Sequence, residues 1–167
     1  MRMLVALFVL LASMIRSADA QTEPLVDHVY ILVGAWHCHS NRGADWKLTF
    51  VQNVDGSMTA TKGSYSNGYA QVTTTLSNRI FSDSYVYDPQ QQVWTDTERA
   101  DESYDNLFVG TARPWTGDQW HIVGRFTYGN GVTAIPERKT YTLMGPDLIR
   151  MQLARGTFFS ESICNRF

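Results

Sequence analysis

Apolar and polar residues alternate along most of this chain with a period of two. Trp46, Leu48 and Phe50 are separated by polar side chains, and the same period recurs at 119–128 and 148–155. Alternation of this kind is typical of a strand with one buried face. It predicts antiparallel strands joined by tight turns.

Turn-forming pairs such as Asp55-Gly56 divide the chain into runs rich in Thr, Val and aromatic residues, which suit strands. The segment 158–165 either adds an edge strand or covers one. A single short helix is predicted at 24–32, where it would plug one end of a barrel. The other runs predict strands at 34–40, 46–54, 57–63, 69–76, 79–88, 92–99, 106–113, 119–128, 138–144 and 148–155.

The two cysteines favour a closed sheet over an open one. A meander of strands leaves two exposed edges, and closure removes them. Cys38 and Cys164 are the only cysteines, and they can bond only if their Cα atoms come within about 7 Å. We therefore predict an all-β fold: an antiparallel, up-and-down closed barrel of about 8–10 strands with a short N-terminal helix. One disulfide would join the first strand to the C-terminal segment, and two free thiols or an intermolecular bond are the alternatives.

Residues 1–20 have the pattern of a signal peptide. Arg2 precedes an apolar run at 3–12, and Ala18-Asp19-Ala20 is a small-x-small cleavage site. The apolar run is too short to span a hydrocarbon layer of about 30 Å. We expect a secreted protein, extracellular or periplasmic, in which 21–167 form a single β-barrel domain.

Charge narrows the partners that the chain can have. The whole chain has 14 basic and 16 acidic residues, so that loss of Arg2, Arg16 and Asp19 leaves 12 and 15. An acidic chain without a cluster of Lys and Arg is a poor partner for nucleic acid. We expect no nucleic-acid partner, no membrane span and a monomer.

Gly34-Ala35-Trp36 on the first predicted strand, followed by a meander, resembles the start of the lipocalin and fatty-acid-binding (calycin) barrels. The resemblance implies a lipocalin-like barrel with Trp36 at its closed end. It also implies an arginine from a late strand across the indole, for which Arg150 is the first candidate and Arg155 the alternative. The pattern departs from typical lipocalins, because a second mid-chain signature and a long C-terminal helix are missing.

Two sets of residues are candidates for ligand binding. If the barrel encloses a polar cavity, Arg125 could bind a carboxylate with His121 as a second donor. The alternative places both side chains in solvent on the outer face of an ordinary strand. Tyr85, Tyr87 and Trp94 could line the rest of the cavity, or they could simply fill a barrel core.

Motifs for metal binding and catalysis are missing from the sequence. His37 and His39 share one strand face, but two imidazoles alone rarely hold zinc, so we predict no metal site. The acidic stretch formed by Asp96, Glu98, Asp101 and Glu102 is interpreted as a solvated turn. No nucleophile elbow, zinc-protease motif or phosphate loop occurs, and we expect no cofactor.

These observations together favour a secreted protein that binds a small apolar or amphipathic ligand. A protein-binding module, such as a secreted protease inhibitor, is the second hypothesis, and an enzyme housed in the cavity is the third. The size of the interior discriminates between them, because a cavity of a few hundred cubic ångströms favours a ligand and a filled interior favours a protein partner.

Overall fold

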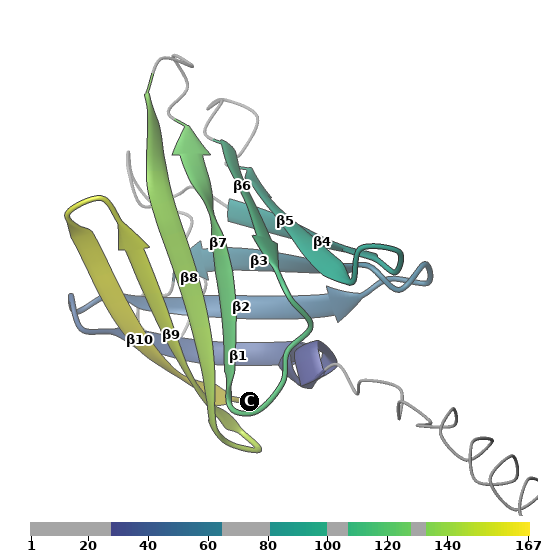
Figure 1. Ribbon diagram of the computed structural model, residues 1–167. Helices are drawn as coiled ribbons and strands as arrows, with labels where there is room; N and C mark the ends of the chain where they lie inside the picture. Colours follow the sequence, from purple (N-terminus) through teal and green to yellow (C-terminus); the bar gives the residue numbers. More distant parts are fainter. Residues whose placement is uncertain (1–27, 65–80, 100–106, 128–132) are drawn as a thin grey trace, which may run out of the picture.

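The computed structural model describes residues 28–64, 81–99, 107–127 and 133–167, and these residues form ten strands preceded by a short 3-10 helix (Figure 1). No helix among the described residues has the length and apolar character that a membrane crossing requires. The elements are η1 (His28–Leu32), β1 (Gly34–Ser40), β2 (Asp45–Gln52), β3 (Met58–Ser64), β4 (Phe81–Asp88), β5 (Val93–Arg99), β6 (Leu107–Ala112), β7 (Gln119–Thr127), β8 (Ala134–Gly145), β9 (Leu148–Arg155) and β10 (Phe158–Arg166).

Each strand pairs with the next one along the chain, and β10 pairs with β1 to close the barrel. All ten pairings are antiparallel. The predicted closed, up-and-down barrel is therefore confirmed. The C-terminal segment is the closing strand β10, not an edge strand or a cover. The predicted strand at 69–76 lies outside the described residues, and the predicted helix is reduced to the 3-10 turn of η1.

The disulfide joins the two strands that close the barrel. Cys38 and Cys164 lie directly opposite each other in the β1–β10 ladder, and their Cα atoms are 3.9 Å apart. Both side chains are fully buried. The predicted disulfide between the first strand and the C-terminal segment is therefore confirmed, and it also fixes the register of β1 against β10.

η1 lies at one end of the barrel (Figure 1), and Trp36 is fully buried beside it. Its indole nitrogen donates a hydrogen bond to the Leu32 carbonyl (2.7 Å), so the side chain caps η1. The guanidinium of Arg166 lies over the indole ring at 4.2 Å and donates to the carbonyls of Ile31 and Val33, at 2.6 Å each. Gly34 has a φ of 131°, and a Cβ there would come within 2.6 Å of the guanidinium.

The arginine across Trp36 is therefore Arg166, and the expectation of Arg150 or Arg155 is wrong. Arg150 alternates with the buried Ile149 and Met151 on β9, so it lies on the outer face of that strand. Arg155 lies at the far end of β9, over the ring of Phe126.

Aromatic side chains fill the half of the barrel next to η1, which we call the η1 half. Trp115 and Trp120 stack with ring centroids 6.2 Å apart, and Trp94 meets Trp120 edge to face at 6.3 Å. Farther along the barrel, Phe50 and Tyr141 pack edge to face at 6.0 Å. Ring contacts of this geometry stabilise the fold beyond the contribution of burial itself. The packed rings fill the interior of the η1 half.

We expect Trp36→Ala to lower the free energy of unfolding by about 3–5 kcal/mol, because it leaves a cavity under Arg166 and removes the cap of η1. His37→Ala is the control, because the neighbouring side chain points outward. The control should change stability by about 0.5 kcal/mol or less in the same denaturant titration. Equal stability of the two variants would show that Trp36 does not hold this end of the barrel.

Candidate functional site

Charged side chains lie inside the barrel, beyond the aromatic half. Lys139 on β8 is fully buried, and its ammonium contacts Asp83 Oδ1 at 2.5 Å, Asp96 Oδ2 at 2.9 Å and Glu98 Oε2 at 2.8 Å. Lys62 on β3 contacts Asp83 Oδ2 and Glu98 Oε2, each at 2.8 Å. We call these five residues, which come from β3, β4, β5 and β8, the charge cluster.

Strand alternation explains why these residues face inward. Asp83 follows the phase of buried Tyr85, Asp96 and Glu98 follow that of Trp94, and Lys139 follows that of Tyr141. A charge can stay buried only when opposite charges and hydrogen bonds compensate it, and each strand supplies part of that compensation. The prediction that Asp96 and Glu98 belong to a solvated turn is therefore wrong, since both are buried on β5. Asp101 and Glu102 of the same stretch lie outside the described residues.

The ring of Phe108 on β6 supports the cluster from one side. The ammonium of Lys139 lies 4.2 Å from the centroid of this ring, a distance at which a cation is attracted to the aromatic face. Gly110 and Gly124 leave the room that the ring needs, because a Cβ at either position would lie within 2.8 Å of a Phe108 ring carbon.

The cluster holds most of its charges firmly. Burial acts to lower the pKa of Lys62 and of Lys139, but the surrounding carboxylates outweigh it and raise both pKa values above their ordinary range. Burial acts to raise the pKa of Glu98, yet the two ammonium groups hold it well below its ordinary value. Lys62, Lys139 and Glu98 therefore remain ionised near neutral pH.

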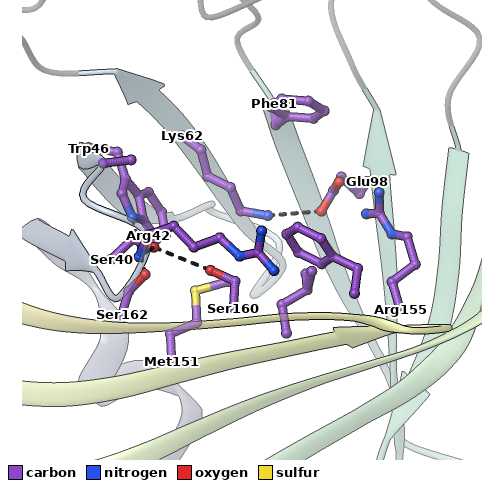
Figure 2. A pocket seen from close by; sticks show the side chains of 13 residues that line it. Ser40, Arg42, Trp46, Lys62, Phe81, Glu98, Met151, Arg155, Ser160 and Ser162 are labelled. Atoms are coloured by element: carbon purple, nitrogen blue, oxygen red, sulfur yellow. Dashed lines mark hydrogen bonds and ion pairs between the residues drawn. The ribbon is translucent and has the colours of Figure 1, made fainter.

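A cavity of about 410 Å³ lies on the other side of the charge cluster, at the end of the barrel opposite η1. Lys62 and Glu98 belong both to the charge cluster and to the lining of the cavity, and Figure 2 shows the ion pair between them at the side of the cavity. The described residues that line it are Ser40, Arg42, Ala44, Trp46, Lys62, Phe81, Glu98, Met151, Leu153, Arg155, Phe158, Ser160 and Ser162.

The lining combines an apolar surface with a row of hydroxyl groups. Ser40 and Ser160 are hydrogen-bonded at 3.3 Å, and the indole nitrogen of Trp46 donates to Ser162 Oγ at 3.3 Å. The aromatic and aliphatic part consists of Trp46, Phe81, Met151, Leu153 and Phe158. A ligand that fits this lining has an apolar body and a polar edge or head.

Three cationic side chains, those of Arg42, Lys62 and Arg155, line the cavity. Arg42, from the β1–β2 turn, lies over the ring of Phe158 at 4.4 Å and donates through Nε to the Phe159 carbonyl at 3.0 Å. Its guanidinium is drawn among the lining side chains in Figure 2. Arg155 donates through Nε to the buried Glu137, so its charge is matched outside the lining. Lys62 is likewise paired with Asp83 and Glu98, so Arg42 is the lining cation that has no carboxylate partner among the described residues.

The structure places Arg125 and His121 outside this site: the hypothesis that they face a polar cavity is wrong, and the alternative, the outer face of an ordinary strand, is confirmed. Trp120, Ile122 and Phe126 occupy the inner face of β7, while His121 and Arg125 are exposed on the outer face. The reason is that burial of the three large apolar side chains stabilises the fold, whereas the same side chains on the outer face would remain in water. His121 contacts the Thr140 hydroxyl at 3.1 Å, and Arg125 donates to the Ala134 carbonyl.

Tyr85, Tyr87 and Trp94 point inward but pack in the η1 half. The rings of Tyr87 and Trp94 lie 5.2 Å apart, and the Tyr85 hydroxyl lies 3.3 Å from that of Tyr141. None of the three is among the described residues that line the cavity. Of the two interpretations of these aromatic residues, lining a ligand cavity and filling the barrel core, the structure confirms the second.

His37 and His39 lie on the outer face of β1, beside Asp45. His39 Nδ1 is 2.8 Å from the Asp45 carboxylate, and His37 Nε2 is 3.7 Å from it. Within the described ranges, no group of His, Cys, Asp and Glu has the geometry to hold a metal ion.

Replacing Lys139 with methionine should lower the free energy of unfolding by about 3–5 kcal/mol near neutral pH, because three buried carboxyl groups lose their shared cation. The loss should be smaller in acid, where those groups can protonate. Lys47→Met is the control, since Lys47 is a surface lysine over Phe167 and should cost about 1 kcal/mol or less. Equal denaturation midpoints for the two variants would show that the cluster is not a structural element.

Comparisons with known proteins leave the family open. No family model matches the chain, and no curated protein matches it. Among solved structures, one match is a redesigned β-barrel, mFAP1, bound to DFHBI, with 12% sequence identity and a TM-score of 0.31. The match covers 82% of this chain and 95% of the other. At this TM-score the description of the fold rests on the strand ladders above.

Proposed function

We propose that this protein binds a small amphipathic molecule with one negative charge in the cavity opposite η1. The observation that carries the proposal is the cavity itself, whose volume of about 410 Å³ lies in the range of small-molecule sites. A filled interior would have favoured a protein-binding module. The apolar lining suits the body of such a ligand, and the guanidinium of Arg42 suits its negatively charged head.

The ionisation of the lining residues favours binding over acid–base catalysis. A general acid or base works best when its pKa lies near the operating pH. The pKa of Lys62 is raised and that of Glu98 is lowered, so neither group exchanges protons readily at neutral pH. Both are better suited to hold charge in place beside a bound molecule.

We also propose that the protein works outside the cytoplasm, after removal of residues 1–20. The buried disulfide between Cys38 and Cys164 supports this, since such bonds persist mainly in oxidising compartments. A lipocalin-like ancestry is part of the same proposal. It is supported by the closed antiparallel barrel and by the contact between Trp36 and Arg166.

The anionic dye 1-anilinonaphthalene-8-sulfonate should bind the protein with enhanced fluorescence and compete with the natural ligand. Leu153→Trp places a large ring in the cavity and should weaken this binding by about tenfold or more. Val123→Trp is the matched control, because it adds the same ring to the outer face of β7. The control should bind as tightly as the parent, and so should Arg125→Met.

Circular dichroism and thermal melting establish that both tryptophan variants keep the barrel. Equal loss of dye affinity in the two variants, or no loss in Leu153→Trp, would contradict binding in the cavity. The uncharged analogue N-phenyl-1-naphthylamine should bind more weakly than the sulfonate. A preference for the uncharged analogue would contradict the proposed negative charge of the ligand.

A further inference from the structure

The charge cluster contains an odd number of ionisable groups. Two ammonium groups, from Lys62 and Lys139, face the three carboxyl groups of Asp83, Asp96 and Glu98. When all five are ionised, the buried cluster carries one uncompensated negative charge. A single proton on one carboxyl group makes it neutral.

The contacts identify Asp96 as the group that takes this proton. Asp83 and Glu98 each contact both ammonium groups, at 2.5–2.8 Å for Asp83 and 2.8 Å for Glu98. Asp96 contacts only Lys139. In the described part of the chain, Asp83 Oδ2 and Asp96 Oδ1 are both buried without a hydrogen bond, but Asp83 Oδ2 lies 2.8 Å from the Lys62 ammonium, whereas Asp96 Oδ1 has no ion-pair contact. The ionised form of Asp96 is therefore the least stabilised of the three.

We propose, on the basis of the proposed function, that anion binding is coupled to a proton: when an anionic ligand enters the cavity, Asp96 takes up one proton, so that the protein holds the ligand more tightly in acid than in alkali. The proton comes from solvent and ends on the Asp96 carboxyl group. No covalent bond to the ligand is formed.

The surroundings of Asp96 poise it to titrate near neutral pH. Burial raises the pKa of Asp96 to about 7, Lys139 and Lys62 act to lower it, and Asp83 acts to raise it further. Titratable groups face Asp96 from four strands: Lys62 on β3, Asp83 and Tyr85 on β4, Glu98 on β5, and Lys139 and Tyr141 on β8. The remaining neighbour, β6, presents Gly110 and Phe108 to this region. Burial raises the pKa of Tyr141 to about 12 and that of Tyr85 well above its ordinary value, so both tyrosines remain neutral.

The link between the cavity and Asp96 passes through Lys62, Glu98 and Lys139. Lys62 and Glu98 line the cavity, and Glu98 Oε2 is 2.8 Å from both ammonium groups. An anion beside Lys62 adds negative charge to this dry environment and competes for the same cations. Because like charges disfavour each other's ionised form, the anion raises the pKa of Asp96 and favours its protonated state.

The direction of the pH effect follows from this coupling. Below about pH 7 Asp96 is already protonated in the free protein, so affinity for an anion should be nearly constant. Above about pH 7 the bound state holds more protons than the free state, and affinity falls as pH rises. We expect binding of the sulfonate dye to be about tenfold weaker at about pH 8.5 than at about pH 6.

Isothermal titration calorimetry with 1-anilinonaphthalene-8-sulfonate tests the proposal, because the charge of the sulfonate does not change over this pH range. Titrations in buffers of different ionisation enthalpy should show uptake of a substantial fraction of one proton near about pH 8. Asp96→Asn should abolish the uptake and keep tight binding in alkali. Asp118→Asn, the same change in an exposed turn, should behave like the parent.

Parallel pH dependence in the parent and Asp96→Asn would overturn the coupling while leaving binding in the cavity intact. No dye binding at any pH would overturn both proposals. If Asp96→Asn does not fold, carbon-13 NMR of the parent's carboxyl groups gives the same answer. The chemical shift of the Asp96 carboxyl carbon should titrate with a midpoint near neutral pH, and addition of the dye should move this midpoint to higher pH. A midpoint that the dye leaves unchanged would overturn the coupling.

Discussion

The ammonium of Lys139, held between three carboxyl groups inside the barrel, is the interaction on which the rest of the structure depends. An isolated charge at this depth would be very costly, so its partners must converge on it from separate strands. Asp83, Asp96 and Glu98 can do so only in one strand order and one register. The cluster therefore constrains how β4 and β5 face β8, in the same way that the disulfide constrains β1 and β10.

The charge cluster also separates the two functions of the interior. On one side, tryptophans and tyrosines fill the η1 half, and the contact between Arg166 and Trp36 closes its end. On the other side, the same lysines and carboxylates become part of the cavity lining through Lys62 and Glu98. A ligand in the cavity thus meets charges that are already fixed by the fold, which reduces the ordering that binding requires. It also meets a cluster in which the three carboxyl groups outnumber the two ammonium groups.

Strand periodicity and the cysteine pair were enough to predict the closed barrel, but several side-chain positions required more. The arginine over Trp36 could have been found: Cys38 opposite Cys164 in an antiparallel ladder places Trp36, two residues earlier, opposite Arg166, two residues later. Asp96 and Lys139 lie in phase with buried aromatic residues on their own strands, and this phase was the available signal. That they meet across the barrel depends on strand order and tilt, which periodicity does not contain. For β7, the alternation left both faces open, and the bulk of Trp120, Ile122 and Phe126 decides that His121 and Arg125 are outside.

The division of the interior into a filled half and a binding half is tested most directly by the indole signals of the five tryptophans. Trp46 lines the cavity, whereas Trp36, Trp94, Trp115 and Trp120 are buried in the η1 half. In proton–nitrogen NMR spectra of the labelled protein, addition of 1-anilinonaphthalene-8-sulfonate should shift the Trp46 indole signal and leave the other four nearly unchanged. A dye that binds and shifts the four buried indoles, or leaves Trp46 unmoved, would contradict the account.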